Sequence, residues 1–170
     1  MNIRLATVAD IPSIMQVIAE VVPGMIASGN FQWDHTYPNA AVFEEDISLG
    51  QLWLAETDGG IAGVSAITTE QYAEYADVGL DINETAIVTH RLAVSPRYRG
   101  RGIAAMLMQQ AEQVAADKGI AVLRVDTNTT NKATQSLFPK MGYRFAGEMG
   151  LAFRPGLRFY CYEKRLDGNR

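Results

Sequence analysis

Leu92–Ala104, which reads Leu-Ala-Val-Ser-Pro-Arg-Tyr-Arg-Gly-Arg-Gly-Ile-Ala, is the stretch that decides the fold of this chain. A strand ends before Pro96, a turn with two glycines follows, and an amphipathic helix runs from Gly102 to Lys118. Such a turn directs several backbone N–H groups at one point, and the helix dipole adds positive potential there. Gly100 and Gly102 allow positive φ angles and let the backbone approach a ligand closely. The segment therefore predicts a binding turn for a pyrophosphate.

The residues around the two glycines narrow the kind of phosphate site. Arg97, Arg99 and Arg101 add positive charge to the turn. A Walker loop ends in Gly-Lys-Ser or Gly-Lys-Thr, whereas this turn ends in Gly-Ile-Ala. A dinucleotide fingerprint needs a third glycine where Ala105 stands, although Asp126 on the next predicted strand matches its acidic residue. The Walker motif is therefore excluded and the dinucleotide fingerprint is only a partial match.

Hydrophobic periodicity and turn residues predict the other elements around this segment. Strands are predicted at residues 2–6, 52–56, 61–69, 85–94, 122–126, 143–149 and 157–166. Helices are predicted at residues 11–22, 40–49, 102–118 and 131–141, the first being disturbed by Pro23-Gly24. The aromatic, turn-rich segment 29–39 and the polar segment 70–84 are predicted loops. This order indicates a single domain of mixed α/β class over residues 1–170.

Composition and charge exclude several classes of function. The net charge of −4 disfavours non-specific binding to nucleic acid or to an anionic membrane, because both need a basic surface. The single cysteine, Cys161, excludes an internal disulfide framework and fits a reducing cytoplasm. No signal peptide is expected, and prolines and polar residues interrupt the apolar stretch 11–27, so we predict no membrane-spanning helix. Two histidines and one cysteine form no metal-ligand spacing, so no metal is expected.

A second motif follows the glycine turn. Asn131 precedes Leu137–Tyr143, which reads Leu-Phe-Pro-Lys-Met-Gly-Tyr. The first motif is Arg97-x-x-Gly100-x-Gly102, preceded by Leu-Ala-Val-x-Pro. Together, and in this order of strands and helices, the two motifs resemble the CoA-binding segments of the GNAT superfamily of acetyl-CoA-dependent N-acetyltransferases.

The resemblance extends over nearly the whole chain and implies a fold. Trp33, Tyr37-Pro38 and the strand His90–Val94, which reads His-Arg-Leu-Ala-Val, are similar to a bacterial subgroup of this superfamily. The implied structure is the GNAT acyl-CoA N-acyltransferase fold of the α/β class. It has a mixed, mostly antiparallel sheet with a splayed parallel central pair of strands, and helices on both faces.

The resemblance also implies acetyl-CoA as cosubstrate and a set of residues that bind it. The backbone of Leu92, Ala93 and Val94 is expected to pair with the pantetheine arm, and Asn131 to bond its amides. The backbone N–H groups of the glycine turn are expected to hold the pyrophosphate. The complete CoA set is Leu92, Ala93, Val94, Arg99, Gly100, Arg101, Gly102, Ile103, Ala104, Asn131 and Phe138.

The expected catalytic residues are His90, Val94 and Asp126. The N–H of Val94 would stabilise the oxyanion that forms when an amine attacks the thioester. His90 lies four residues before Val94, so uninterrupted alternation puts both side chains on one face, and His90 would remove the amine proton through a water. Asp126 could act as the base instead or bind the positive charge of the amine. Each also has a structural alternative, since His90 could be a buried hydrogen-bonded residue and Asp126 could cap a turn or pair with Arg124 or Lys132.

The general acid is not identified. Many superfamily members have a tyrosine that protonates the leaving thiolate, and Phe138 occupies the matching position here. Tyr143, Tyr160 or a water could replace it, and a thiol with a pKa near ~8.5 also leaves readily as thiolate. Cys161 lacks a catalytic arrangement and is expected to be a small core residue.

The acceptor pocket is predicted from four residues, namely Trp33, Tyr37, His90 and Asp126. Trp33 and Tyr37 have a structural alternative as loop anchors that pack on the core. His35, in the same loop, is expected to be solvated.

The function favoured by the sequence is transfer of acetyl from acetyl-CoA to a small-molecule amine, by direct attack in a ternary complex. A protein or peptide N-acetyltransferase and a non-catalytic CoA-sensing module are the alternatives. We expect a cytoplasmic protein without nucleic-acid or membrane partners, and we leave a homodimer open.

Overall fold

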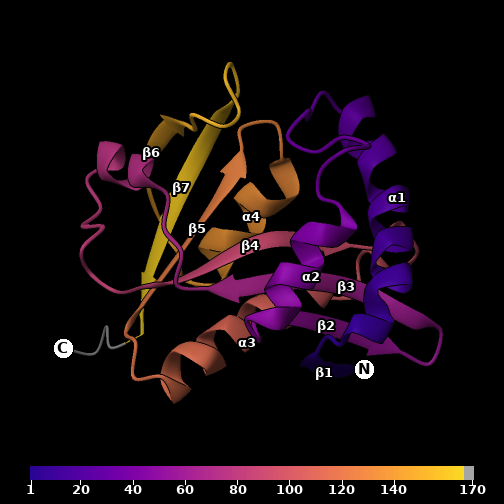
Figure 1. Cartoon of the computed structure of the whole chain (residues 1–170). Coiled ribbons are helices and arrows are strands. Elements are labelled where there is room, and N and C mark those ends of the chain that lie inside the picture. The colour runs from indigo at the N-terminus through magenta and orange to yellow at the C-terminus, as the bar shows by residue number, and fades with distance from the viewer. Residues whose placement is uncertain (167–170) are drawn as a thin grey trace. The chain divides into compact units, whose positions relative to one another are not determined.

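The computed structural model describes residues 1–166, in which strands and helices follow one another as predicted (Figure 1). The strands are Asn2–Leu5 (β1), Leu52–Thr57 (β2), Gly60–Thr68 (β3), Ile87–Val94 (β4), Val122–Asn128 (β5), Arg144–Gly150 (β6) and Arg158–Arg165 (β7). The α-helices are Ile11–Ala27 (α1), Ala40–Ser48 (α2), Ile103–Asp117 (α3) and Lys132–Lys140 (α4). Short 3-10 helices lie at Val8–Asp10 (η1), Ala73–Val78 (η2) and Pro96–Tyr98 (η3).

The strands form one seven-stranded sheet in the order β1-β2-β3-β4-β5-β7-β6. β1 with β2, β2 with β3, β5 with β7 and β6 with β7 are antiparallel pairs. β4 and β5 are parallel, with Ile87 opposite Leu123 and Val88 opposite Arg124. The prediction of a mixed, mostly antiparallel sheet with a parallel central pair is therefore confirmed.

The chain divides into two compact units, which we describe separately. Unit 1 comprises residues Met1–Thr68 and Thr89–Gln110, and unit 2 comprises Thr69–Val88 and the residues from Ala111 onward. Both β4 and α3 begin in one unit and end in the other. The single domain expected over residues 1–170 stays a prediction.

In unit 1, α1 and α2 cover one face of β2 and β3 (Figure 1). Leu52 and Leu54 belong to the apolar cluster under these helices, as the two-residue period of a strand requires. Helical spacing of three and four residues puts the buried residues of α1 on one side, where they join that cluster. These residues are Ile14, Val17, Ile18, Val21 and Val22.

The first turns of α3 cover the opposite face of the unit 1 strands. Ile103 and Leu107 form a second apolar cluster with Ala55, which alternates with Leu54 along β2. A Cβ on Gly63 of β3 would lie 2.8 Å from Ile103 Cγ2, so this glycine permits the close approach of helix and strand. Within unit 1, the expectation of helices on both faces of the sheet is correct.

Helix α1 corrects one expectation. We predicted that Pro23-Gly24 disturbs the helix, but it continues through both residues to Ala27. Proline removes one intrahelical hydrogen bond, and burial of Val21 and Val22 just before it outweighs that loss. The stretch Val8–Ala27 is long and apolar enough to span a membrane by length and composition alone, a test that core helices of globular proteins also pass. One side of α1 packs in the core of unit 1.

Unit 2 is built on β5, β7 and β6, and it corrects a second expectation. The polar segment 70–84, predicted as a loop, contains the 3-10 helix η2. Tyr75 of η2 is fully buried in an apolar cluster with Phe159 and Cys161 of β7. Tyr72, Val78 and Leu80 pack against the same cluster, so tertiary contacts fix a segment whose sequence has no helical or strand period.

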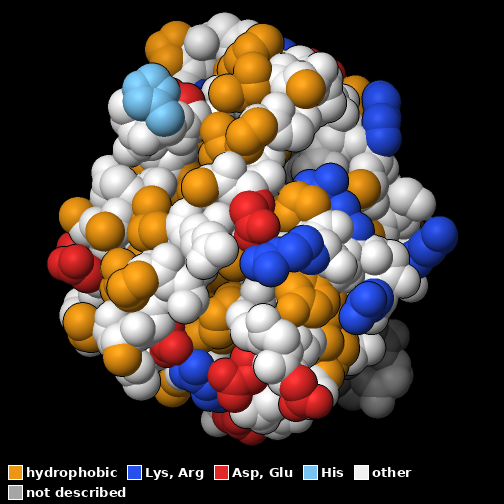
Figure 2. Space-filling model, turned by 90° about the vertical axis from the view of Figure 1, so that its right-hand side faces the viewer, with side chains coloured by type: hydrophobic (Ala, Val, Ile, Leu, Met, Phe, Trp, Pro, Cys, Tyr) orange, Lys and Arg blue, Asp and Glu red, His pale blue; other side chains and the backbone are white. Residues whose placement is uncertain are grey.

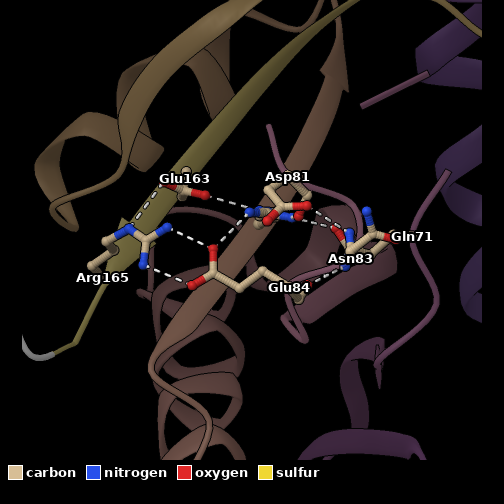
Figure 3. A network of polar contacts seen from close by, with 7 residues as sticks. Gln71, Asp81, Asn83, Glu84, Glu163 and Arg165 are labelled. Atoms are coloured by element: carbon tan, nitrogen blue, oxygen red, sulfur yellow. Dashed lines mark hydrogen bonds and ion pairs between the residues drawn. The ribbon is translucent and has the colours of Figure 1, made fainter. Parts of the chain in front are cut away.

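A buried arginine ties the same segment to the sheet of unit 2. Arg124 of β5 has 1% side-chain exposure, and its Nε donates to Glu163 Oε2 at 2.9 Å. Its Nη1 donates to the side chain of Gln71 and to the carbonyl of Asp81, at the two ends of the segment. Figure 3 shows the surrounding network, in which Glu84 also binds Arg165 of β7. The guanidinium thus joins β5, β7 and the segment that carries η2.

Replacing Arg124 with glutamine should lower the free energy of unfolding by about 3–5 kcal/mol, because Glu163, Gln71 and the Asp81 carbonyl all lose the buried guanidinium that joins them. Arg165→Gln is the matched control, since Arg165 is 47% exposed and pairs with Glu84 and Glu163 at the surface. That control should cost about 1 kcal/mol or less. Urea denaturation of both variants measures the difference, and equal losses would contradict a structural role for the buried guanidinium.

Candidate active site

The segment that follows β4 is anchored in unit 1 before it reaches the two glycines. The backbone N–H of Ser95 donates to the carbonyl of Ala62 at 2.8 Å, and the buried Ser95 Oγ accepts from the N–H of Arg97. The 3-10 helix η3 then leads into the turn. The turn therefore starts from a fixed point at the end of the strand.

The two glycines have the backbone conformation that the sequence predicted. Gly100 has a φ of 78° and Gly102 a φ of 77°, both in the left-handed region that other residues adopt at a cost. A Cβ would meet no atom within 4 Å at either glycine, so the constraint is conformational. The first helical hydrogen bond of α3 runs from Met106 N to Gly102 O. The N–H groups of Ile103 and Ala104 precede it and have no intrahelical acceptor.

Positive charge surrounds this turn, although its arginines differ in their contacts. Arg97, Arg99 and Arg101 are all exposed. Arg97 pairs with Glu20 of α1 at 3.2 Å, and the Arg101 guanidinium lies 5.5 Å from the centre of the Tyr98 ring. The face in Figure 2 carries acidic as well as basic side chains, consistent with the net charge of −4. The turn is a local concentration of donors and positive charge.

Strand β4 departs from regular geometry at Arg91, whose φ of 53° is left-handed. The expectation that His90 and Val94 share a face stays a prediction. His90 is buried, with 7% exposure.

The side chain of Arg91 binds a residue that the sequence did not single out. Its Nε and Nη2 donate to the two carboxylate oxygens of Asp46 on α2, at 2.7 and 2.6 Å. Its Nη1 lies 3.4 Å from the hydroxyl of Tyr37 in the predicted acceptor loop. Trp33, from the same loop, is 5% exposed and belongs to the core cluster under α1 and α2. The loop is thus anchored by Trp33 and contacts β4 through Tyr37.

In unit 2, Asp126 of β5 is half-buried and accepts a hydrogen bond from the Tyr75 hydroxyl at 2.6 Å. Burial and the charge of Asp126 hold the pKa of Tyr75 well above its ordinary value, so the phenol stays protonated and donates. Arg124, an expected alternative partner of Asp126, forms ion pairs with Glu163 and Glu84. Sequence reasoning missed Tyr75, because the polar segment around it showed no periodic signal.

The second predicted CoA segment forms the start and body of α4. Asn131 caps this helix, with its Oδ1 accepting from Thr134 N at 3.2 Å, so its amide NH2 is the group directed to other partners. Phe138 is 1% exposed and packs against the rings of Tyr143 and Tyr162.

Two further groups of unit 2 have a clear structural setting. Tyr143 is buried, and burial raises the pKa of its hydroxyl, which makes it a poor proton donor. Cys161 is a fully buried core residue, as predicted, and burial raises the pKa of its thiol to about 12. Among residues 1–166, no group of three or more His, Cys, Asp or Glu side chains is arranged to hold a metal ion.

Comparison with known proteins agrees with this geometry. Residues 22–143 match the model of the acetyltransferase (GNAT) family. The chain therefore belongs to this family and is an acyltransferase. Seven strands with a parallel β4–β5 pair are its GNAT fold.

Two curated relatives and one solved structure match this chain over most of their length. The chain is 27% identical to the uncharacterized N-acetyltransferase YesJ of Bacillus subtilis, over 84% of this chain and 81% of that protein. It is 26% identical to the L-methionine sulfoximine/L-methionine sulfone acetyltransferase of Pseudomonas aeruginosa PAO1, over 99% of this chain and 96% of that protein. A crystal structure of a GNAT-family acetyltransferase from Streptococcus agalactiae is 29% identical, with a TM-score of 0.82, and covers 96% of this chain and 94% of that one.

The GNAT family uses acetyl-CoA, and the residues of the glycine turn fit its pyrophosphate. Two left-handed glycines, exposed arginines and the N-terminal N–H groups of α3 provide a cradle for an anion. The exposed backbone at Gly100 and Gly102 carries no side chain that would shield it. The individual contacts to the cosubstrate stay predictions.

Gly102→Asp should lower the affinity for CoA by at least about tenfold, because it adds a negative charge and strains the turn. Gly119→Asp is the matched control, since Gly119 follows the other end of α3 with a φ of 67°. It introduces the same charge in the same backbone conformation, away from the first turn of the helix. Isothermal titration calorimetry with CoA compares them, and unchanged affinity in Gly102→Asp would disprove the assignment.

Proposed function

We propose that this acyltransferase transfers acetyl from acetyl-CoA to the amine of a small molecule. The observation that carries the proposal is the segment Leu92–Ala104, in which the end of β4 leads through two left-handed glycines into a helix N-terminus. The glycine turn and the helix N-terminus are suited to a pyrophosphate. The segment begins in β4, whose backbone could pair with the extended pantetheine arm. Membership in the acetyltransferase family supports transfer of acetyl rather than CoA sensing without turnover.

A small-molecule acceptor is supported by the Pseudomonas relative, whose name describes an acetyltransferase for L-methionine sulfoximine and L-methionine sulfone. The two chains match over nearly their full lengths. In this chain, the predicted acceptor loop is packed against its own unit through Trp33. We infer an amine acceptor, with its identity left to experiment.

Acetyl-CoA supplies an acetyl group activated as a thioester. The backbone of Leu92, Ala93 and Val94 is proposed to bind the pantetheine arm, and the N–H of Val94 to stabilise the oxyanion. The N–H groups and side chains of residues 99–104 are proposed to hold the pyrophosphate. The NH2 group of Asn131 is proposed to bond a pantetheine amide.

Two side chains are proposed to act on the amine, one as a base and one as a binding group for its positive charge. His90 is proposed to remove a proton from the amine through a water, since imidazole exchanges protons near neutral pH. Asp126, held by the neutral Tyr75 hydroxyl, is proposed to bind the positive charge of the amine. Phe138 has no proton to donate, so the thiol of CoA leaves as thiolate, which its ordinary pKa near ~8.5 permits.

The direct test is release of free CoA when the protein is mixed with acetyl-CoA and a panel of small amines. We expect release that depends on both protein and amine. A thiol reagent reports it with little background, because the one cysteine of the chain is buried and its thiol pKa is raised to about 12. Mass spectrometry of the acetylated amine confirms the product. Binding of acetyl-CoA without amine-dependent release across the panel would favour a non-catalytic role.

His90→Ala should lower kcat/KM for the amine by roughly 10²-fold, in line with the contribution of a general base, and leave CoA affinity nearly unchanged. His35→Ala is the matched control, because His35 is exposed in the loop before α2. The ratio of kcat/KM between the two variants, measured from pH 6 to 9 at saturating acetyl-CoA, isolates the base. Near-normal turnover of His90→Ala would return this residue to a structural role.

A further inference from the structure

Arg91 combines a strained backbone with a buried charge. Within residues 1–166 it is the one non-glycine residue with a left-handed φ, 53°. An L residue in this conformation is disfavoured by about tenfold or more, so other interactions must hold it there. Its neighbours along β4 are His90 on one side and Leu92–Val94 on the other, which are the residues proposed to move the proton and to bind pantetheine.

The interaction that holds Arg91 is a bidentate ion pair with Asp46. Both hydrogen bonds are short, 2.6 and 2.7 Å, and the Asp46 side chain is only 3% exposed. Gln51 Nε2 donates to the same carboxylate at 3.0 Å. A bidentate pair fixes the orientation of the guanidinium relative to the carboxylate as well as the distance between them. It therefore fixes the position of Arg91 relative to α2.

The charge of this pair is permanent. Burial alone would lower the pKa of Arg91, but the hydrogen bond and charge of Asp46 raise it above its ordinary value. Arg91 is therefore charged at every pH at which the protein is folded. Because its fork is used by Asp46, Arg91 is a poor candidate for binding a carboxylate on the acceptor.

The same guanidinium also reaches the predicted acceptor loop. Its Nη1 lies 3.4 Å from the Tyr37 hydroxyl, and Tyr37 precedes α2 by only three residues. Asp46 and Tyr37 thus connect the loop and its helix to one residue of β4.

We propose that Arg91 and Asp46 are a positioning pair for acetyl transfer: the pair holds residue 91 of β4 in its left-handed conformation and sets the acceptor loop against the strand. The proposal rests on the proposed function, since it concerns the strand that is proposed to bind pantetheine. Without the pair, residue 91 returns to the extended conformation, and the N–H groups of Leu92–Val94 change direction. Activity would then fall because these N–H groups are misaligned with the cosubstrate, although none of them has been removed.

Two double variants that differ by a single methyl group test this. Arg91→Gly with Asp46→Asn and Arg91→Ala with Asp46→Asn both remove the ion pair without leaving a buried unpaired carboxylate. Glycine adopts a φ of 53° freely, whereas alanine does not. We expect kcat for amine acetylation to be about tenfold lower in the alanine double variant than in the glycine one, with wild-type protein above both.

The control for stability alone is Asp10→Asn, which removes another two-pronged pair of unit 1, with Arg4 on β1. It should lower the melting temperature and leave kcat and KM unchanged. Equal kcat in the two double variants would overturn the proposal, and so would wild-type kcat in both. If a double variant does not fold, Asp46→Asn alone carries the test, with a kcat decrease of about tenfold expected and an unchanged kcat overturning it.

A readout independent of activity separates this proposal from the proposed function. Amide resonances of Leu92, Ala93 and Val94 should keep wild-type chemical shifts in Arg91→Gly/Asp46→Asn and move in Arg91→Ala/Asp46→Asn. Absence of acetyl transfer by wild-type protein would contradict the proposed function, while these shifts would still report on the backbone conformation at residue 91. Identical shifts in the two variants would overturn the positioning role, whatever the activity.

Discussion

The ion pair between Arg91 and Asp46 is the interaction on which the course of β4 depends. It joins a helix to a strand residue whose backbone would otherwise prefer another conformation. From that residue the chain continues through Leu92–Val94, the anchored Ser95 and the two glycines to the start of α3. A change in direction at Arg91 is therefore passed along the segment that holds the most specific sequence signal in the chain.

The sequence predicts those parts of the site in which a local backbone conformation requires one particular type of residue. Gly100 and Gly102 are examples, because a tight turn into a helix requires positive φ and glycine supplies it at least cost. Arg91 is the opposite case. Nothing local marks it, since its left-handed form is maintained by Asp46, 45 positions away in the chain.

Two further differences have the same origin in tertiary contacts. Pro23 is a helix breaker by local rules, yet α1 continues because neighbouring residues are buried against the strands. The segment around Tyr75 has no period, yet it is ordered because one ring enters the core of unit 2 and Arg124 binds both of its ends. Hydrophobic periodicity predicts where helices and strands lie, whereas contacts between residues far apart in the chain explain the departures from that prediction.

Gly63 has a consequence that reaches beyond its own strand. Its missing side chain lets Ile103 and Leu107 rest directly on β3, and a Cβ there would also come within 3.0 Å of the Ala93 carbonyl. The distance between α3 and β3 is thus as short as it is because residue 63 has no side chain. Gly63 thereby controls the packing distance of the helix start that is proposed to bind the phosphates, so a substitution beneath the helix would disturb the glycine turn without altering the turn's own sequence.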